Sequence, residues 1–319
     1  MVDWYIWVGF IGFIALVLLL DLGIFHRQAH RVLFKEALGW TAVWVTLAMV
    51  FVLVMWVWQG GQVAGEFLAG YLIEWSLSLD NVFVWILIFT HFSVPARYQH
   101  RVLFWGIVGA VALRLGFILG GTALIHRFDW ITYVFGVLLL VTAIRFLTRR
   151  EQERSIGETA ILRLVRRFIP VTDSYEGQNL TVRRGGKLLA TPLLAVLIVV
   201  ELTDVVFAVD SIPAIFAVTQ DAFVVFASNA LAVLGLRSLY FVLAGAVSRF
   251  HYLRPALAAL LGFVAVKMLI AEWIHIPIGI SLASIVAILA VGAFASLIHL
   301  RRHPEDRMGV RTSASPDTR

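Results

Sequence analysis

Nine stretches of about twenty predominantly apolar residues follow one another along almost the whole chain. They lie at 4–25, 38–58, 66–90, 102–124, 130–148, 189–212, 222–247, 255–274 and 278–299. An α-helix needs about this length to cross the hydrocarbon core of a bilayer. The composition agrees, because 61% of the 319 residues are hydrophobic and only 14% are charged, whereas soluble domains are roughly 45–50% apolar and about 25% charged. The sequence therefore predicts an all-α, polytopic membrane protein of about nine transmembrane helices.

One sizeable polar segment interrupts these stretches. It covers 149–187 and divides a single transmembrane domain over 1–300 into a first half at about 38–148 and a second half at about 189–274. We interpret it as an ordinary cytoplasmic linker that joins the two halves. The alternative is a short amphipathic helix on the membrane surface at 161–168, where arginines alternate with apolar residues. Residues 301–319 are rich in charge, serine and proline and predict a disordered cytoplasmic tail.

The positive charges are distributed very unevenly between the two predicted sides of the membrane. If the N-terminus is outside, 22 of the 26 Lys and Arg residues fall in the inner loops and the tail, and one, Arg127, falls in an outer loop. Cytoplasmic loops carry such an excess, so we expect the N-terminus outside and the C-terminus in the cytoplasm. The net charge of +6 is then a signal of topology, and the expected partner is the lipid bilayer and not a nucleic acid. The chain has no cysteine, which excludes disulfides, thiolate metal sites and dithiol redox chemistry.

Two of the apolar stretches, 66–90 and 189–212, contain several carboxylates. A charged side chain at the bilayer centre costs about 2.5–3.5 kcal/mol, so it is retained only if it faces a cavity, a counter-charge or an ion. The carboxylates and the polar residues directly after them are Glu74, Asp80, Asn81, Glu201, Asp204, Asp210 and Ser211. They indicate a membrane transporter or an ion-binding membrane protein.

The two acidic stretches belong to an internal repeat. Asp80 aligns with Asp210, and the segment LRLGFILGG at 113–121 resembles LRSLYFVLAG at 236–245. On the predicted topology the two acidic helices run in opposite directions, so the repeat is inverted, as in many secondary transporters whose site lies near the midplane. The repeat places one arginine in each half, Arg114 and Arg237. We expect them to be counter-charges along an ion path, or simply to pair with the carboxylates and hold helices together.

A single straight helix would not bring all the polar side chains of a stretch together. On a helix, the spacing puts Glu74, Ser78 and Asn81 on one face, and it puts Glu201, Asp204 and Ser211 on one face of the second stretch. Asp80 and Asp210 project away from these faces. Pro213 offers a solution, because it lacks an N–H and disturbs the carbonyl of Val209 four residues earlier. We therefore expect the helix to break there and to expose backbone oxygen beside Asp210, as discontinuous helices do at sites within the membrane.

The predicted ligands are all hard oxygen donors. Carboxylates, an amide oxygen, a hydroxyl and backbone carbonyls suit Mg²⁺, Ca²⁺ or Mn²⁺. These two spans contain no histidine or cysteine, which argues against Zn²⁺ and Cu⁺. Protonation of the same acids would release the ion, which predicts exchange against protons. The residues alone do not choose among the three divalent ions.

The acidic motifs resemble the two signature motifs of the TerC family of membrane proteins. The motifs are EWSLSLDNVFV at 74–84 and FAVDSIPA at 207–214, and DLGIFHR at 21–27, YQHRVLFWG at 98–106 and LGLRSLYF at 234–241 extend the resemblance over about 10–300. The chain is most similar to the Alx branch of that family. The resemblance implies a bacterial inner-membrane protein of the LysE superfamily type, with a seven-helix core, tied to manganese efflux, manganese homeostasis and tellurium resistance. Carried over by position, the resemblance implies that the seven polar residues named earlier form the ion path.

We expect a non-enzymatic exporter of Mn²⁺ that binds no cofactor permanently and carries Mn²⁺ as its cargo. The main alternative is a non-transporting membrane partner, either a scaffold in metal, tellurium or pH stress or a factor that supplies metal to other proteins, with the loop 149–187 as its docking site. A tellurite or redox factor is disfavoured, because an acidic path repels oxyanions and the chain has no thiol. An exchanger of calcium or another cation is a further alternative.

Overall fold

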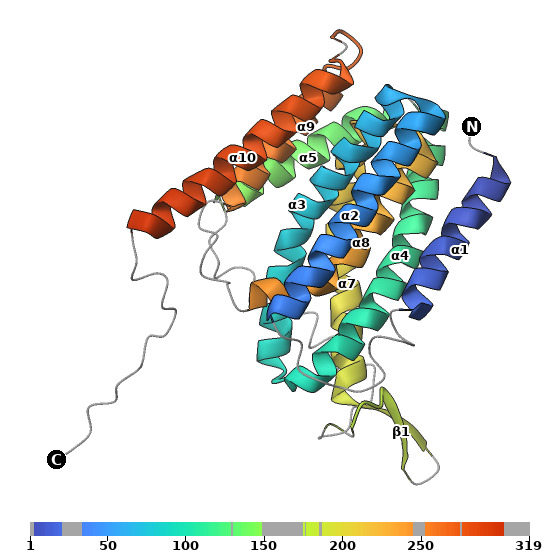
Figure 1. Ribbon diagram of the computed structural model, residues 1–319, viewed down its shortest axis with the longest axis vertical. Helices are drawn as coiled ribbons and strands as arrows, with labels where there is room; N and C mark the ends of the chain where they lie inside the picture. The colour runs from blue at the N-terminus through green and yellow to red at the C-terminus, as the bar shows by residue number, and fades with distance from the viewer. Residues whose placement is uncertain are drawn as a thin grey trace.

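The computed structural model describes residues 3–20, 34–128, 130–148, 175, 177–184, 187–244, 253–274 and 276–302. These residues form an α-helical bundle with one small β-hairpin (Figure 1). The helices are α1 (Trp4–Leu20), α2 (Phe34–Gln59), α3 (Gly61–His91), α4 (Ala96–Arg127), α5 (Ile131–Thr148), α7 (Pro192–Phe216), α8 (Ala222–Ala244), α9 (Leu253–Leu269) and α10 (Ile278–Arg302). The hairpin consists of β1 (Thr181–Arg184) and β2 (Lys187–Ala190).

Seven helices of the described part are long and apolar enough to cross a membrane: α2, α3, α4, α5, α7, α8 and α10. The other two, α1 and α9, are apolar but have only 17 residues each. The predicted span at 255–274 is longer than α9, because the chain turns after Leu269. The predicted class, an all-α polytopic membrane protein, is confirmed.

The helices α3 and α8 form the centre of the bundle. Nearly every residue of α8 is buried, and α3 packs against α2, α7, α8 and α10. At the crossing of α3 and α8 a glycine is required, because a Cβ on Gly70 would lie 2.7 Å from Ser228 Oγ. Figure 1 shows α5, α9 and α10 lying together beside this bundle, and α5 packs closely on α9. The apolar side chains that remain exposed, such as Val57 at 91%, suit a lipid environment.

The hairpin replaces the start of the predicted span at 189–212. Thr181 pairs with Ala190 and Arg184 with Lys187 in an antiparallel register, and α7 begins only at Pro192, where proline is tolerated. The helix begins three residues after the predicted start, because a hydropathy window counts the apolar residues 189 and 190 as helix, whereas they pair with β1. Apart from the hairpin and a few residues before it, the loop 149–187 lies outside the described residues, as do the alternative amphipathic helix at 161–168 and residues 303–319 of the predicted tail.

The expected break at Pro213 is not present. The helix α7 continues through Pro213 to Phe216. Proline removes one helical hydrogen bond, to the carbonyl of Val209, but here it stands in the last turn. The helix ends three residues later, where the backbone N–H of Ala217 donates to the carbonyl of Pro213 over 3.2 Å. The loss of one bond at this place does not divide the helix, although the carbonyl of Val209, next to Asp210, has no helical N–H to accept from.

Candidate functional site

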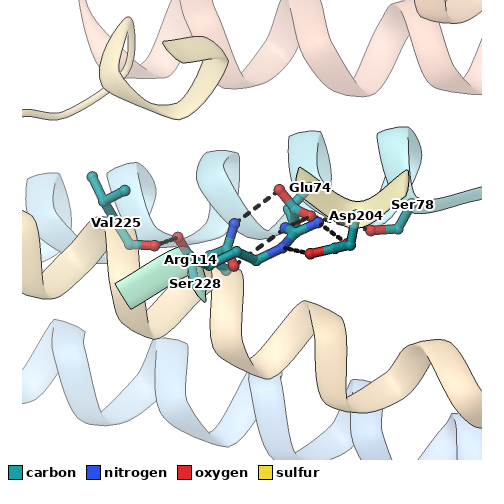
Figure 2. Close-up of polar contacts among 7 residues, drawn as sticks. Glu74, Ser78, Arg114, Asp204, Val225 and Ser228 are labelled. Atoms are coloured by element: carbon teal, nitrogen blue, oxygen red, sulfur yellow. Dashed lines mark hydrogen bonds and ion pairs between the residues drawn. The ribbon is translucent and has the colours of Figure 1, made fainter. Parts of the chain in front are cut away.

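A fully buried arginine connects the two acidic helices. Arg114 of α4 has 0% side-chain exposure and lies between Glu74 of α3 and Asp204 of α7 (Figure 2). Its Nε and Nη2 donate to the two carboxylate oxygens of Asp204 over 3.1 and 2.9 Å, and Nη1 forms an ion pair with Glu74 Oε1. Two parallel bonds to one carboxylate are the strong form of this contact. The arginine therefore holds α3, α4 and α7 together through its charge.

Two uncharged side chains complete the contacts of Glu74. Asn229 of α8 donates from Nδ2 to Glu74 Oε2 over 3.0 Å, and its Oδ1 accepts from Arg114 Nη1 over 3.3 Å. Ser78, one turn along α3, donates to Glu74 Oε1 over 3.2 Å, which confirms the predicted shared face of these two residues. Asn229 was not among the predicted site residues. The available signal was an amide within an apolar span, next to Ser228.

A second polar contact joins α5 and α7. Thr142 of α5 donates from Oγ1 to Asp210 Oδ1 over 2.9 Å. The charges of Arg145, on the next turn of α5, and of Asp80 on α3 also act on Asp210. Nothing in the sequence of α5 distinguished Thr142 from the other threonines of that helix. The side chain of Asp210 is thus held at the contact of α5 and α7.

Three of the seven predicted residues carry a buried oxygen with no hydrogen-bond partner. Five such side-chain atoms occur in the part of the chain that the structure describes, and Asn81 Oδ1, Glu201 Oε2 and Ser211 Oγ are three of them. Asn81 and Ser211 are each only 2% exposed. Buried polar atoms are nearly always paired, and an unpaired one costs about 1–3 kcal/mol. Such an oxygen can be satisfied by a water molecule, an ion or a neighbouring polar group.

Glu201 occupies a notch in the neighbouring helix. Its carboxylate lies against the backbone of Gly109 in α4, where an added Cβ would be only 2.0 Å from Oε1. The charge of Asp204, one turn further along α7, acts on the same group. The residue is half-buried. Glu201 and Asp204 thus both face α4, as their spacing of three residues requires.

The remaining predicted residues lie apart from the arginine. Asp80 is buried at 4% exposure. Arg237 of α8 contacts His100 at the beginning of α4, with 3.1 Å between Nη1 and Nε2. The proposed repeat would make Arg237 equivalent to Arg114, but the two arginines differ in these contacts. Its role as a counter-charge on an ion path stays a prediction.

The predicted residues do not form one metal centre. In the described ranges no three His, Cys, Asp or Glu side chains gather in a way that could hold a metal ion. Instead, Glu74 and Asp204 surround Arg114, while the other five lie outside that ion pair. A cavity of about 530 Å³ between α4, α5 and α7 is lined by apolar residues and glycines. None of its lining residues has a polar side chain, and Val209 and Pro213 are among them.

Comparison with known proteins gives a consistent result. Residues 59–304 match the integral membrane protein TerC family. The chain is 51% identical over 300 residues to an uncharacterized membrane protein, STKORF319, of Myxococcus xanthus, with 94% of each chain covered. It is 45% identical over 314 residues to a protein of Escherichia coli K12 named "Putative membrane-bound redox modulator Alx", with 95% of this chain and 98% of the other covered. No solved structure matches.

Proposed function

Because the chain belongs to the integral membrane protein TerC family, we propose that it is a transporter that exports Mn²⁺ from the bacterial cytoplasm in exchange for protons. The observation that carries this proposal is the set of acids on α3 and α7 inside an apolar helical bundle, accompanied by unpartnered oxygens of Asn81, Glu201 and Ser211. A membrane protein retains such groups for an ion or substrate path.

The chemistry of the donors supports a hard divalent cation. Carboxylate, amide and hydroxyl oxygens suit Mn²⁺, Mg²⁺ and Ca²⁺, and the resemblance of both acidic motifs to those of the TerC family selects manganese among them. Mn²⁺ is the cargo in this proposal, and the protein has neither a resident cofactor nor an enzymatic activity.

The packing of the helices supports the proposed inverted repeat. The repeat makes α3 equivalent to α7 and α4 equivalent to α8. If the two halves are equivalent, the contact between α3 and α8 should have a counterpart between α7 and α4. Both contacts are extensive. The helices α3 and α7 run in opposite directions (Figure 1). We place the protein in the inner membrane with its N-terminus outside, on the strength of the Lys and Arg distribution.

A second candidate function rests on the names of the relatives. Several are called redox modulators, which favours a membrane partner that acts without transport, as a scaffold or as a factor that supplies metal to other proteins. The chain has no cysteine, so a redox role would need a partner that supplies the redox group. The segment 149–187 is the proposed docking site for such a partner.

Flux of ⁵⁴Mn²⁺ into proteoliposomes that contain the purified protein separates the two functions. We expect flux in the wild type, an increase with an opposing proton gradient, and loss in Asp80→Asn and in Asp210→Asn. A folded wild-type protein without flux under pH gradients of either direction would overturn the transport proposal. A second experiment deletes most of the segment 149–174. A transporter keeps its Mn²⁺ flux without this segment, whereas a protein that acts by docking a partner loses its effect on the cell.

A further inference from the structure

The buried cluster around Arg114 holds two acids and one base (Figure 2). The side chains of Glu74 and Arg114 have 0% exposure, and that of Asp204 has 3%. When both acids are ionised, the single guanidinium neutralises only one of the two negative charges. Buried charges are stable when they are fully paired. The charge of the two carboxylates therefore matches one divalent cation better than it matches one guanidinium.

The guanidinium occupies oxygens of the kind that a hard cation binds. Both oxygens of Asp204 and Oδ1 of Asn229 accept from Arg114, and Glu74 Oε1 forms an ion pair with it. Carboxylate and amide oxygens are ligands of hard divalent cations. A divalent cation can therefore use these oxygens only if the guanidinium leaves them. We call Glu74, Arg114, Asp204 and Asn229 the arginine layer.

The register of α3 against α7 places a neutral oxygen opposite Asp204. The two helices run in opposite directions (Figure 1), and a Cβ added to Gly70 of α3 would lie 3.1 Å from Ile215 Cγ2 of α7. Eleven residues forward from Gly70 lead to Asn81, and eleven residues back from Ile215 lead to Asp204. Because each residue advances both helices by the same rise, Asn81 and Asp204 lie at about the same level.

The same register places a neutral oxygen opposite Glu74. Four residues from that contact in each helix lead to Glu74 and to Ser211. Asn81 follows Glu74 by seven residues, and Ser211 follows Asp204 by seven, so each shares the face of the acid on its own helix. Asn81 Oδ1 and Ser211 Oγ are buried and have no hydrogen-bond partner. Each acid of the layer thus has an uncharged oxygen on the facing helix that is free to join it as a ligand.

A third carboxylate lies where a displaced guanidinium can pair again. Glu201 precedes Asp204 by one turn of α7, its Oε2 is buried without a partner, and its carboxylate lies against Gly109 of α4. Gly109 precedes Arg114 by five residues, which is about 7.5 Å along the helix axis. Side chains on a helix point toward its N-terminus, so the long side chain of Arg114 is directed toward this end of α4.

We propose that Arg114 competes with the transported cation for Glu74 and Asp204. When the cation binds, it displaces the guanidinium, which pairs with Glu201 instead. This inference rests on the proposed transport function and deepens it. The exchange leaves no positive charge unpaired within the membrane, which would otherwise oppose binding of the cation. Return of the guanidinium to the two acids expels the cation.

Removal of the competitor is the first arm of the test. The purified full-length protein is titrated with MnCl₂ in a calorimeter, and its melting temperature is measured with and without MnCl₂. We expect Arg114→Gln to bind Mn²⁺ at least about tenfold more tightly than the wild type, because the ion no longer has to break a buried ion pair. Mn²⁺ should also raise the melting temperature of this variant by more than that of the wild type.

Two further variants support this arm. Arg101→Gln removes the same charge from the same helix, at a residue that contacts Gln178 over 3.5 Å and not the layer, and it measures the general effect of charge on affinity. If Arg114→Gln does not fold, Arg114→Lys decides. It keeps the charge but cannot form the two parallel bonds to Asp204, so we expect Mn²⁺ to displace it more easily than it displaces the arginine.

The second arm tests Glu201 as the acceptor of the guanidinium. Glu201→Gln should lower Mn²⁺ affinity at least about tenfold when Arg114 is present, because the displaced charge then has no partner. In the Arg114→Gln background the same substitution should change affinity by less than about threefold, since there is no guanidinium to receive. A direct ligand of the ion would instead lose affinity equally in both backgrounds.

Each outcome decides one proposal. An affinity that is unchanged or lower in the Arg114 variants overturns the competition, and equal losses from Glu201→Gln in both backgrounds overturn the transfer of Arg114 to Glu201. A wild type that binds Mn²⁺ in detergent but does not transport it overturns the proposed function, and the affinities still decide the competition. If neither the wild type nor the Arg114 variants bind Mn²⁺, both proposals are wrong.

Discussion

The carboxylate of Glu201 lies directly on the backbone of Gly109, so that at this point only the Glu201 side chain separates α7 from α4. One oxygen of this carboxylate is buried without a hydrogen-bond partner. The absence of a side chain at position 109 is therefore what gives a titratable group its place in the seam between the two helices.

Gly109→Ala is expected to displace Glu201. The new Cβ would lie 2.0 Å from Oε1, so the carboxylate, which is the movable end of a long side chain, leaves the notch. We expect reduced Mn²⁺ flux with little change in melting temperature. Gly116→Ala in the same helix is the matched control, because no atom lies within 4 Å of its added Cβ. Equal flux in the two variants would contradict a role for the position of Glu201.

Arg114→Gln is expected to destabilise the protein more than Gly109→Ala does. It leaves two buried carboxylates without their counter-charge, and loss of one partner of a buried ion pair costs about 3–5 kcal/mol. Denaturation in detergent micelles measures this change. Addition of Glu74→Gln and Asp204→Asn to the variant should restore most of the lost stability. Failure of the two amides to restore it would mean that the shape of Arg114, and not its charge, holds the helices.

Much of the fold was predictable because hydropathy acts over short distances along the chain. The apolar stretches of about twenty residues locate most of the helices, and the spacing of Glu74 and Ser78 predicts the contact that the structure contains. The two acidic motifs were also visible as charges in places where lipid is expected. Each of these signals lies within one helix, so a single sequence is enough to find it.

The partners of the acids were not predictable in the same way. Asn229 lies 155 residues from Glu74 in the chain, and Thr142 lies 68 residues from Asp210. Such contacts depend on how the helices pack, which no local pattern encodes. The expected break at Pro213 was wrong for a different reason, since the effect of a proline depends on how much helix follows it. The inverted repeat and the ion path stay predictions.

Thr142→Val is expected to weaken Mn²⁺ transport without unfolding the protein. The substitution removes the hydroxyl that donates to Asp210. One hydrogen bond contributes about 0.5–1.5 kcal/mol, so we expect the KM for Mn²⁺ to rise roughly 2–10-fold. Thr142→Ser keeps the hydroxyl and should transport like the wild type. Thr148→Val is the control on the same helix, because that hydroxyl donates to the carbonyl of Ile144. A similar rise in KM for Thr148→Val would assign the effect to α5 in general.

The predicted orientation can be tested directly because the chain has no cysteine. A single cysteine then reacts with a membrane-impermeant maleimide without any background from the protein itself. Gln62 lies at the start of α3 and Asn179 lies just before the hairpin, and both are exposed. The excess of Lys and Arg in the predicted inner loops places Gln62 outside and Asn179 in the cytoplasm. We therefore expect intact spheroplasts to label Gln62→Cys and not Asn179→Cys, and inside-out vesicles to give the reverse. The opposite labelling would invert the topology and turn the proposed export into uptake.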